Sequence, residues 1–426
     1  MKFWDRISHL TQEAFPRLHF LFTGEQRATV NMPKAVIDWI NNAFNDGEKT
    51  TAGITVDSDT ALTHSAVYRA VNILSSTIAS LPIELFKPDE KGDITKVNSH
   101  PGLRLLTRSP NEIQTPYIFI ETMQTGPLTW GNGYAYIHRD IIGQPKRLQL
   151  IHPKNVQVKA TDQYIFYDIQ DFEGGDKNNV RSMNILHVPG LGYDGVVGKS
   201  PINVAAESIA GGLATQKFGN KFYANGANQT GILMHPHQLS AKAQENLKSS
   251  FDKKTKGLDN AGGTMILEEG LKYQPITIPP EQAQFLQSRR FSVEEVARWF
   301  GLPPHLLADL TKSSYNSIEA QGLEFLIYTL RAWLKRWEQE LDRKLLTESE
   351  LDEGYFFKFN IEGLLRADST TRANFLTMMV NNGLYTINEA RKIEKMPRYN
   401  HENADKLMKQ GQNVPIDNLN NLNNET

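Results

Sequence analysis

The sequence predicts an α+β fold, and three observations carry that prediction. Short strand-like segments separated by Gly, Pro, Asn and Asp fill residues 134–188. Two long helical patterns joined by a proline-bearing polar loop fill residues 281–346. A small insert of strand and helix patterns, residues 231–279, lies between two helical patterns. A chain of 426 residues can bury a sizeable core and divide into two or three lobes.

The first half of the chain alternates helices with short strands. Apolar residues three and four apart predict a helix from His64 that ends before Pro82. Ser200-Pro201 provides an N-cap and a first-turn proline for another helix, which ends near Gly226. Further helices are predicted at 119–128, 240–256 and 369–381, and strands at 83–86, 134–138, 148–151, 156–158, 164–169, 185–188, 231–234, 264–267, 271–278 and 355–359.

The second half is dominated by one long helix. Asn316 and Glu319 have the spacing of a capping box, so we expect a helix from about Ser317 to Leu346. Such a helix is roughly 45 Å long at about 1.5 Å per residue, which suits a strut better than a catalytic element. Its expected buried stripe is Leu323, Leu326, Leu330, Trp333, Trp337, Leu341 and Leu345.

The preceding helical pattern, residues 281–300, ends at a sequence that cannot continue a helix. Gly301 stands first, and Pro303 and Pro304 then remove the amide donors that another turn would need. The sequence therefore predicts a loop between the two long helices. We find no set of catalytic residues near it.

Composition excludes several classes of function. The 46 Lys and Arg against 48 Asp and Glu give a net charge of −2, which argues against a tight nucleic-acid anchor but permits DNA that slides. Cysteine is absent, so disulfides, thiolate metal sites and a cysteine nucleophile are excluded, and we expect folding in a cytoplasm. No apolar run is long enough for a membrane span, and we expect no signal peptide.

A glycine-rich turn is compatible with a nucleotide site. Residues 190–195 match GxGxxG after a predicted strand, but the next helix begins only at Pro201, too far on for its amides to reach a pyrophosphate. A Walker A loop ending at Ser200 would need glycine where Tyr193 stands. A structural turn and a nucleotide site both remain open, and the first is favoured.

Three other motifs have ordinary explanations. Residues 293–304 are similar to the first helix and turn of a helix-turn-helix, yet the prolines leave no room for a recognition helix. His235 and His237 offer two metal nitrogens without a third ligand nearby, which favours a surface loop. Adjacent carboxylates at 268–269 and 294–295 point in different directions, so neither pair forms an acid/base dyad alone.

Four phrases in order resemble the portal protein family of tailed bacteriophages, the head-to-tail connectors of the lambdoid long-tailed type. The resemblance runs from about residue 61 to 380 and is most specific in the last phrase. The phrases are Ser65-Ala66-Val67-Tyr68-Arg69-Ala70-Val71 through Ala79-Ser80-Leu81-Pro82, Gly131-Asn132-Gly133-Tyr134-Ala135-Tyr136, Asp194-Gly195-Val196-Val197-Gly198-Lys199-Ser200-Pro201, and Val296-Ala297-Arg298-Trp299-Phe300-Gly301-Leu302-Pro303-Pro304-His305-Leu306-Leu307.

The resemblance implies a portal-like architecture: an α/β wing, a two-helix stem, a small α/β clip inserted between the stem helices, a long spine helix and a helical C-terminal crown. The implied parts are a variable N-terminal segment 1–60, the wing 61–199, stem helix 200–230, the clip 231–279, stem helix 280–301, the tunnel loop 302–315, the spine helix 316–348, a strand returning to the wing 349–365, the crown 366–411 and a disordered tail 412–426.

The resemblance also implies a function. Such chains close into a homo-oligomeric ring of about twelve copies at a unique capsid vertex of the virion, after assembly in the host cytoplasm. The ring is a conduit for double-stranded DNA during packaging and ejection. Its implied partners are sliding, non-specific DNA, the terminase large subunit, head–tail connector or adaptor proteins, and the major capsid protein or scaffold. No catalytic residue, cofactor, metal or membrane is implied.

The implied site residues fall in three groups. The DNA-facing tunnel loop is Thr311, Lys312, Ser313, Ser314 and Tyr315. The residues that define the loop are Gly301, Pro303, Pro304 and Asn316. Candidates for docking of the terminase on the clip are Glu268, Glu269, Lys253 and Lys254. The alternatives are another ring-forming head–neck or assembly protein, and a nucleotide-dependent enzyme that uses the glycine-rich turn at 190–200.

Overall fold

The chain divides into two compact units, residues 1–359 and 360–426. The computed structural model describes residues 34, 37, 40, 48–89, 93–161, 164–224, 231–236, 238–255, 270–275, 282–308, 321–361, 364, 369–394 and 396–408. The predicted strand at 264–267 and the tail 412–426 lie outside these residues. None of the helices in the described ranges is long and apolar enough to cross a membrane.

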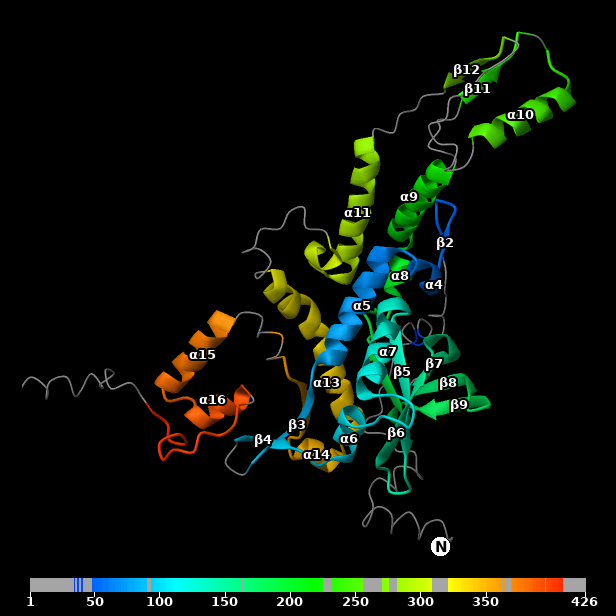
Figure 1. Cartoon of the computed structure of the whole chain (residues 1–426). Helices are drawn as coiled ribbons and strands as arrows, with labels where there is room; N and C mark the ends of the chain where they lie inside the picture. The colour runs from blue at the N-terminus through cyan, green and yellow to red at the C-terminus, as the bar shows by residue number, and fades with distance from the viewer. Residues whose placement is uncertain are drawn as a thin grey trace, which may run out of the picture. The chain divides into compact units, whose positions relative to one another are not determined.

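The first unit mixes helices with short antiparallel strands (Figure 1). Its helices are α4 (Ser58–Ala61), α5 (Ser65–Ser80), α6 (Pro101–Thr107), α7 (Pro116–Thr129), η1 (Pro153–Asn155), η2 (Ser182–Asn184), α8 (Pro201–Val204), α9 (Ala206–Ala224), α10 (Ala241–Thr255), α11 (Gln282–Phe300), η4 (Pro304–Leu307), η5 (Phe325–Leu330), α13 (Arg331–Leu345) and α14 (Glu348–Asp352). Its strands are β1 (Glu48–Lys49), β2 (Thr55–Val56), β3 (Ile83–Pro88), β4 (Ile94–Val97), β5 (Asn132–Arg139), β6 (Pro145–Ile151), β7 (Val156–Ala160), β8 (Ile165–Phe172), β9 (Gly175–Arg181), β10 (Ile185–Pro189), β11 (Gly231–Met234), β12 (Lys272–Pro275) and β13 (Phe356–Phe359). The predicted α+β class is confirmed.

The strands form small antiparallel sheets. Three of these sheets have three strands, in the orders β10-β5-β6, β7-β8-β9 and β13-β3-β4. The pairs β1-β2 and β11-β12 form two-stranded sheets. In the sheet of β13, Phe357 lies opposite Leu85, so a strand near residue 357 joins one near residue 85. The predicted strands that fall in the described ranges are confirmed, whereas β1, β2, β4 and β9 were not predicted.

One core cluster joins the sheets that contain β5, β7, β8 and β10. Tyr134, Val158, Ile169 and Ile185 are among its buried side chains. Ile40, from the N-terminal segment 1–60 that the resemblance implies to be variable, is 3% exposed and belongs to the same cluster. Burial of an isoleucine side chain contributes about 1.5–3 kcal/mol, so this residue fixes part of the N-terminal segment against the sheets.

The predicted spine helix contains a π-helical segment. Residues 321–324 are helical, η5 is a π-helix, and α13 continues to Leu345. Because a π-helix bonds i to i+5, it rotates the following residues around the helix axis. Of the expected stripe, Leu323 is 50% exposed and Trp333 is half-buried, so those two assignments are wrong; Leu334 is buried in addition. The buried stripe is Leu326, Leu330, Leu334, Trp337, Leu341 and Leu345.

Trp337 is the largest fully buried side chain of the helix α13. Its indole Nε1–H donates to Oε1 of Gln124 on α7 at 2.7 Å, which satisfies the polar end of an otherwise apolar group. On its other faces α13 contacts β10 and β13. The helix therefore connects α7 with strands of two different sheets.

The predicted helix at 200–226 is broken near its start. α8 ends at Val204, and Ala205 separates it from α9. The small side chains of this region pack largely within the chain: Ala205, Ala206 and Ala210 are buried. A Cβ on Gly212 would lie 2.5 Å from Nε2 of His64, so a larger residue here would require the His64 ring to move. The buried small residues therefore make contacts inside the subunit.

Glu350 fastens α14 to the first turn of α6. His100 Nδ1 accepts a hydrogen bond from the amide of Gly102, so Nε2 is the protonated nitrogen. Nε2 donates to Oε1 of Glu350 at 3.1 Å. The amide and hydroxyl of Thr347 donate to Oε2. These hydrogen bonds, the one from His100 first, lower the pKa of Glu350 to about 2.

We expect the pKa of Glu350 to be visible in acid unfolding. The unfolded carboxyl has a pKa near 4.5 and the folded one about 2, so its contribution is full above pH 4.5 and is lost as the pH falls toward 2. Relative to the parent, the free energy of unfolding of Glu350→Gln should be lower by roughly 2–3 kcal/mol at pH 6 and almost unchanged at pH 2. Urea unfolding at several pH values measures this. The same difference in Glu353→Gln, a more exposed residue of that turn, would contradict the assignment.

The second unit contains α15 (Ser369–Asn381) and α16 (Ile387–Ile393). Asn388 on α16 is its polar centre and is 9% exposed. Its Nδ2 donates to the carbonyl of Tyr399 and to Oδ1 of Asp405, and its Oδ1 accepts the amide of Tyr399. Asp405 also accepts from Arg398 at 2.6 Å. One side chain therefore organises the irregular segment that follows α16.

Candidate nucleic-acid interface

The turn after α11 has the conformation that its sequence predicts. Gly301 has φ +64°, and the amide of Leu302 donates to the carbonyl of Ala297 at 2.8 Å, which ends the helix. A Cβ on Gly301 would lie 3.0 Å from Oγ1 of Thr329, whose hydroxyl donates to the Gly301 carbonyl. Glycine is therefore required both for its backbone angle and for its contact with η5.

Pro303 and Pro304 then precede and start η4. The described part of this segment runs to Ala308, which has φ +66°. The carbonyl of Leu306 accepts from Nε of Arg69 on α5 at 3.4 Å. This segment thus leaves α11 along a fixed path, held by η5 on one side and by α5 on the other. The described residues resume at Gln321, in the helical turn that precedes η5.

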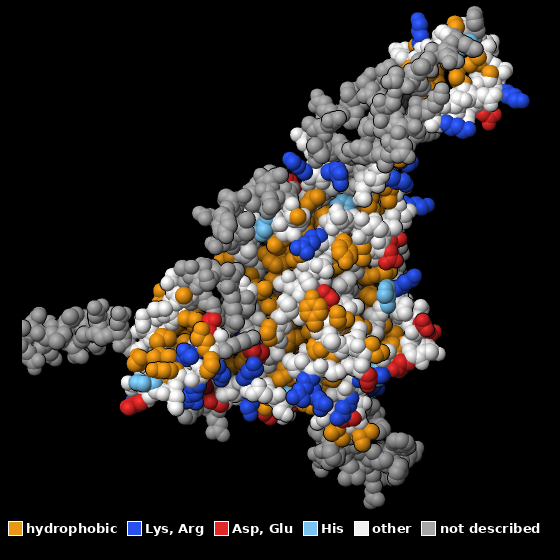
Figure 2. Space-filling view, viewed as in Figure 1, with side chains coloured by type: hydrophobic (Ala, Val, Ile, Leu, Met, Phe, Trp, Pro, Cys, Tyr) orange, Lys and Arg blue, Asp and Glu red, His pale blue; other side chains and the backbone are white. Residues whose placement is uncertain are grey.

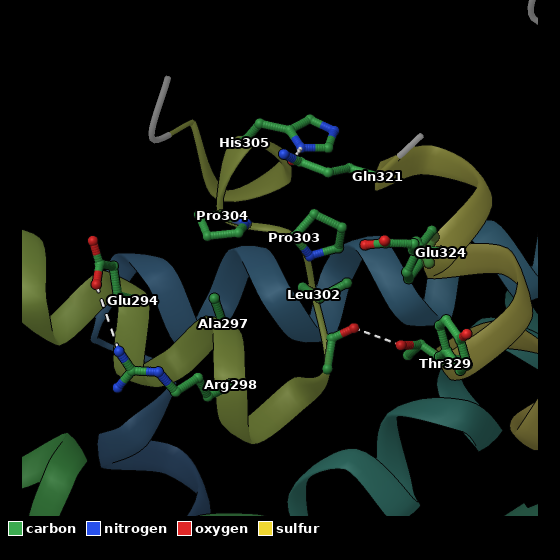
Figure 3. A pocket seen from close by; sticks show the side chains of 13 residues that line it. Glu294, Ala297, Arg298, Leu302, Pro303, Pro304, His305, Gln321, Glu324 and Thr329 are labelled. Carbon is green, nitrogen blue, oxygen red and sulfur yellow. Dashed lines mark hydrogen bonds and ion pairs between the residues drawn. The ribbon is translucent and has the colours of Figure 1, made fainter. Parts of the chain in front are cut away.

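A cavity of about 520 Å³ lies where the two ends of this segment meet. Its walls come from the last turns of α11, the turn before η4, and the start of the spine helix including η5 (Figure 3). The residues lining it are Glu294, Ala297, Arg298, Gly301, Leu302, Pro303, Pro304, His305, Gln321, Glu324, Phe325, Tyr328 and Thr329.

Polar contacts join the walls of the cavity. His305 Nδ1 and Gln321 Oε1 are 2.6 Å apart, so a residue near the start of the predicted loop contacts one that follows the loop (Figure 3). Arg298 pairs with Glu294 at 3.5 Å and also with Glu295. Glu295 accepts from Ser208 on α9 at 3.4 Å, which connects α11 to α9. These contacts fix the two anchor points of the loop.

The structure places some of the predicted site residues and not others. Gly301, Pro303 and Pro304 line the cavity. Lys253 is exposed on α10. Outside the residues whose side chains are described lie Thr311, Lys312, Ser313, Ser314, Tyr315, Asn316, Lys254, Glu268 and Glu269.

The described residues contain no group of three or more His, Asp or Glu that could hold a metal ion. Of the histidine pair at 235 and 237, His237 is outside the described residues. The carboxylates of Glu294 and Glu295 are both engaged by Arg298. The cavity can thus position a loop, and its lining offers charged and aromatic side chains, but it presents no nucleophile with a paired base.

Backbone groups of the glycine-rich turn form hydrogen bonds inside the protein. Asn132 Oδ1 accepts the amide of Gly198 at 2.8 Å, and its Nδ2 donates to the Gly198 carbonyl at 2.8 Å. The amide of Gly190 donates to the carbonyl of Gly131 at 2.7 Å. Because these amides are bonded inside the protein, they are not available to a pyrophosphate. The structural explanation of this motif is therefore favoured over a nucleotide site.

A buried histidine completes the same network. His187 Nε2 donates to Asn132 Oδ1 at 2.9 Å, and the hydroxyl of Tyr167 lies 3.1 Å from its Nδ1. Burial lowers the pKa of His187 to about 3, so the ring is neutral and can accept from Tyr167. Sequence reasoning missed Asn132 and His187, because their partners are far apart in the chain. It likewise missed Gln321, Glu324 and Thr329.

A family model for "Phage portal protein" matches residues 65–395. The chain belongs to this family. The resemblance found in the sequence is thereby confirmed. The chain is 35% identical over 368 residues to the portal protein of Enterobacteria phage HK97, which covers 85% of each chain.

Two solved structures are similar to this portal protein in fold. One is an HK97-family phage portal protein from Corynebacterium diphtheriae, with a TM-score of 0.56 and 18% identity, covering 76% of this chain and 99% of that one. The other is the neck of a native gene transfer agent particle computed with C12 symmetry, with a TM-score of 0.52 and 20% identity, covering 90% of this chain and 99% of that one.

Proposed function

We propose that this portal protein forms a closed homo-oligomeric ring at one vertex of a phage capsid and guides double-stranded DNA through it. The observation that carries the proposal is the 35% identity to the HK97 portal protein over 85% of both chains. The twelvefold symmetry of a structurally similar neck supports a ring of head-to-tail copies. The ring acts without enzymatic chemistry, and an ATP-hydrolysing terminase supplies the work of packaging.

The parts of the chain then have separate tasks. The sheets and helices of residues 61–199, with β13, form the wing. α9 and α11, which contact each other, form the stem, and residues 231–279 form the clip that meets the terminase and, later, connector proteins. Residues 302–315 form the tunnel loop, the spine helix lies behind it, and residues 366–411 form the crown.

The anchoring of the loop supports its role in touching DNA. Its first residues are fixed by Gly301 and the prolines, and His305 contacts Gln321 at its return. Between these points stand Thr311, Lys312 and Ser313, which offer hydroxyl groups and one fixed charge. Each additional neutralised phosphate strengthens non-specific binding, so a loop with a single lysine holds DNA lightly and lets it move.

Electron micrographs and native mass of the purified protein test the ring. We expect a closed ring with an axial channel and a flared rim. A monomer at both dilute and concentrated conditions would overturn the proposal, and a ring without an axial channel would favour another ring-forming head–neck protein.

Lys312→Ala tests the conduit separately. The loss of one phosphate contact should reduce DNA retention in filled particles by several-fold and shift its salt dependence, with unchanged ring mass. Lys312→Arg keeps the charge and serves as the control, and it should behave as the parent does. Unchanged retention in both variants would show that Lys312 does not contact DNA. Dissociation of the rings in the alanine variant would place Lys312 in a subunit interface.

A further inference from the structure

The turn between β10 and α8 presents two large apolar side chains to solvent. Leu191 is 79% exposed and Tyr193 is 80% exposed. Isolated exposed apolar residues are common, but these two belong to the same short turn. Both are mostly exposed, so they contribute little buried apolar area to the core of their own subunit.

The turn that carries them is rigid. The amide of Lys199 donates to the carbonyl of Leu191 at 2.8 Å, which closes the loop. Asp194 Oδ1 accepts the amides of Val196 and Val197 at 2.7 and 2.8 Å. The ammonium of Lys199 lies 4.3 Å from the centroid of the Tyr193 ring. A preorganised loop loses little conformational entropy on binding, which favours its use as a protein contact.

A receptor with matching character exists on the same chain. The cavity between α11 and η5 has an apolar wall formed by Leu302, Pro303 and Phe325. Its surroundings include Tyr328, 77% exposed, and Ile327, 43% exposed. Figure 2 shows hydrophobic side chains gathered on the face where α5 and α11 lie in Figure 1. Exposed apolar surface of this kind marks sites of protein association.

The turn and the cavity are separated by packed helices. η4 and α11, which border the cavity, both contact α5. α5 contacts α7, and α7 contacts α8, which begins where the glycine-rich turn ends. In Figure 1, α8 and the end of α11 lie on either side of α5. In a ring of head-to-tail copies, such different surfaces of one chain meet between neighbours.

We propose that the 190–199 turn of one subunit docks in the cavity between α11 and η5 of the next. Tyr193 and Leu191 enter the apolar part, and Lys199 approaches the carboxylate of Glu324 at the rim. The contact rests on the ring proposed above. It would couple the loop of each subunit to its neighbour, because the cavity is bounded by both anchor points of that loop.

Cross-linking tests this contact directly, since the natural chain has no cysteine. The variant Leu191→Cys/Glu324→Cys leaves Tyr193 and Tyr328 in place. Treated as the assembled ring with a short bismaleimide, it should give a ladder of covalent multimers on a denaturing gel. Each single variant should remain monomeric on the gel, and a mixture of the two single variants should give dimers.

The matched control is Ile113→Cys/Glu324→Cys, because Ile113 is 93% exposed and lies outside the turn and the cavity. It should give no ladder. A ladder from the control as strong as that from the test pair would mean collision between rings, and it would overturn the assignment. A fast-migrating monomer from the test pair would place the turn on the cavity of its own subunit, which also overturns it.

Native mass of the unmodified variants separates this proposal from the function on which it rests. A closed ring without multimers from the test pair would reject the docked turn and leave the ring intact. Absence of any ring, in the parent as well, would reject both. As a second readout, Tyr193→Ala should raise the subunit concentration needed for ring formation by at least about tenfold, as expected for a buried aromatic anchor. Ile113→Ala should leave it unchanged, and equal effects of the two would count against the contact.

Discussion

Gly198→Ala is expected to lose more than about 3 kcal/mol of unfolding free energy, beyond the usual cost of overpacking. The added Cβ would lie less than 3.0 Å from the carbonyl oxygen of Gly131 and from the backbone of Gly190. Gly131, Gly190 and Gly198 stand on three backbone segments. Asn132 bonds the segment of Gly198, and the Gly131 carbonyl bonds the amide of Gly190, so none of the segments can withdraw without breaking hydrogen bonds. Equilibrium unfolding in urea, with parent and variant in the same oligomeric state, measures the loss.

Gly211→Ala is the matched control for this prediction. Nothing lies within 4 Å of a Cβ built on Gly211, which is exposed inside α9. Alanine at such a position stabilises a helix by roughly 0.5–1 kcal/mol, so the two substitutions should act in opposite directions. Similar, small effects of both would show that the backbone around Gly198 is not tightly packed.

The same geometry bears on the nucleotide-dependent alternative. A Cβ on Gly192 would lie less than 3.0 Å from the carbonyl oxygen of Val197. Gly192→Ala would therefore disturb the turn whether or not a nucleotide binds, so loss of binding in that variant carries no weight by itself. A direct titration of the parent with a nucleotide is the cleaner measurement, and we expect no binding.

Periodic sequence patterns identified most of the regular elements. The positions of Leu330, Trp337 and Leu341 on one stripe follow from a spacing of three and four, and all three are buried. The same rule failed at Leu323, because η5 separates this residue from the buried stripe of α13 and no local residue type announces a π-helix. Within α13, Leu334 is buried in place of its neighbour Trp333. β9 was missed for a related reason: Gly175–Arg181 is polar, and pairing with β8 rather than apolar alternation makes it a strand.

The candidate site was only partly predictable. Gly301 and the two prolines could be identified, because each acts through its own backbone. Gln321 and Thr329 could not, because their importance comes from contacts with His305 and Gly301, which stand 16 and 28 positions away. Glu324 could not either, because only the fold brings it to the wall of the cavity. Asn132 stands in a recognised phrase, yet its partner Gly198 is 66 positions distant.

The second large effect is expected at the buried ion pair of the spine helix. Lys344 Nζ lies 3.8 Å from Glu340 Oε1, and the side chains are 5% and 13% exposed. Lys344 also donates to the carbonyl of Ser182, and Glu340 accepts the amide of His187 at 3.0 Å. Burial lowers the pKa of Lys344 to about 8 and raises that of Glu340. The pair thus fixes the spine helix to β10 and the turn before it.

Lys344→Met should lower the free energy of unfolding by about 3–5 kcal/mol at pH 7, because it leaves the Glu340 carboxylate buried without the lysine with which it pairs. Without the lysine, the pKa of Glu340 rises further above its unfolded value, so the carboxyl protonates in the folded state as the pH falls. The loss should therefore shrink between pH 7 and pH 5. Lys344→Met/Glu340→Gln keeps an acceptor for the His187 amide and should recover more than half of the lost stability.

Lys335→Met provides the comparison on the same helix. Lys335 is 64% exposed and lies 3.7 Å from Glu338, a surface pair worth at most about 1 kcal/mol. Urea unfolding of the three variants at pH 7 and pH 5 distinguishes the explanations. If Lys344→Met cost no more than Lys335→Met, or if the double variant were as unstable as the single one, the buried charge would not be what holds the spine helix in place. If the predicted recovery is found, the attachment of the helix depends on charge balance at Glu340, and the network from Lys344 through Glu340 to His187 forms one energetic unit.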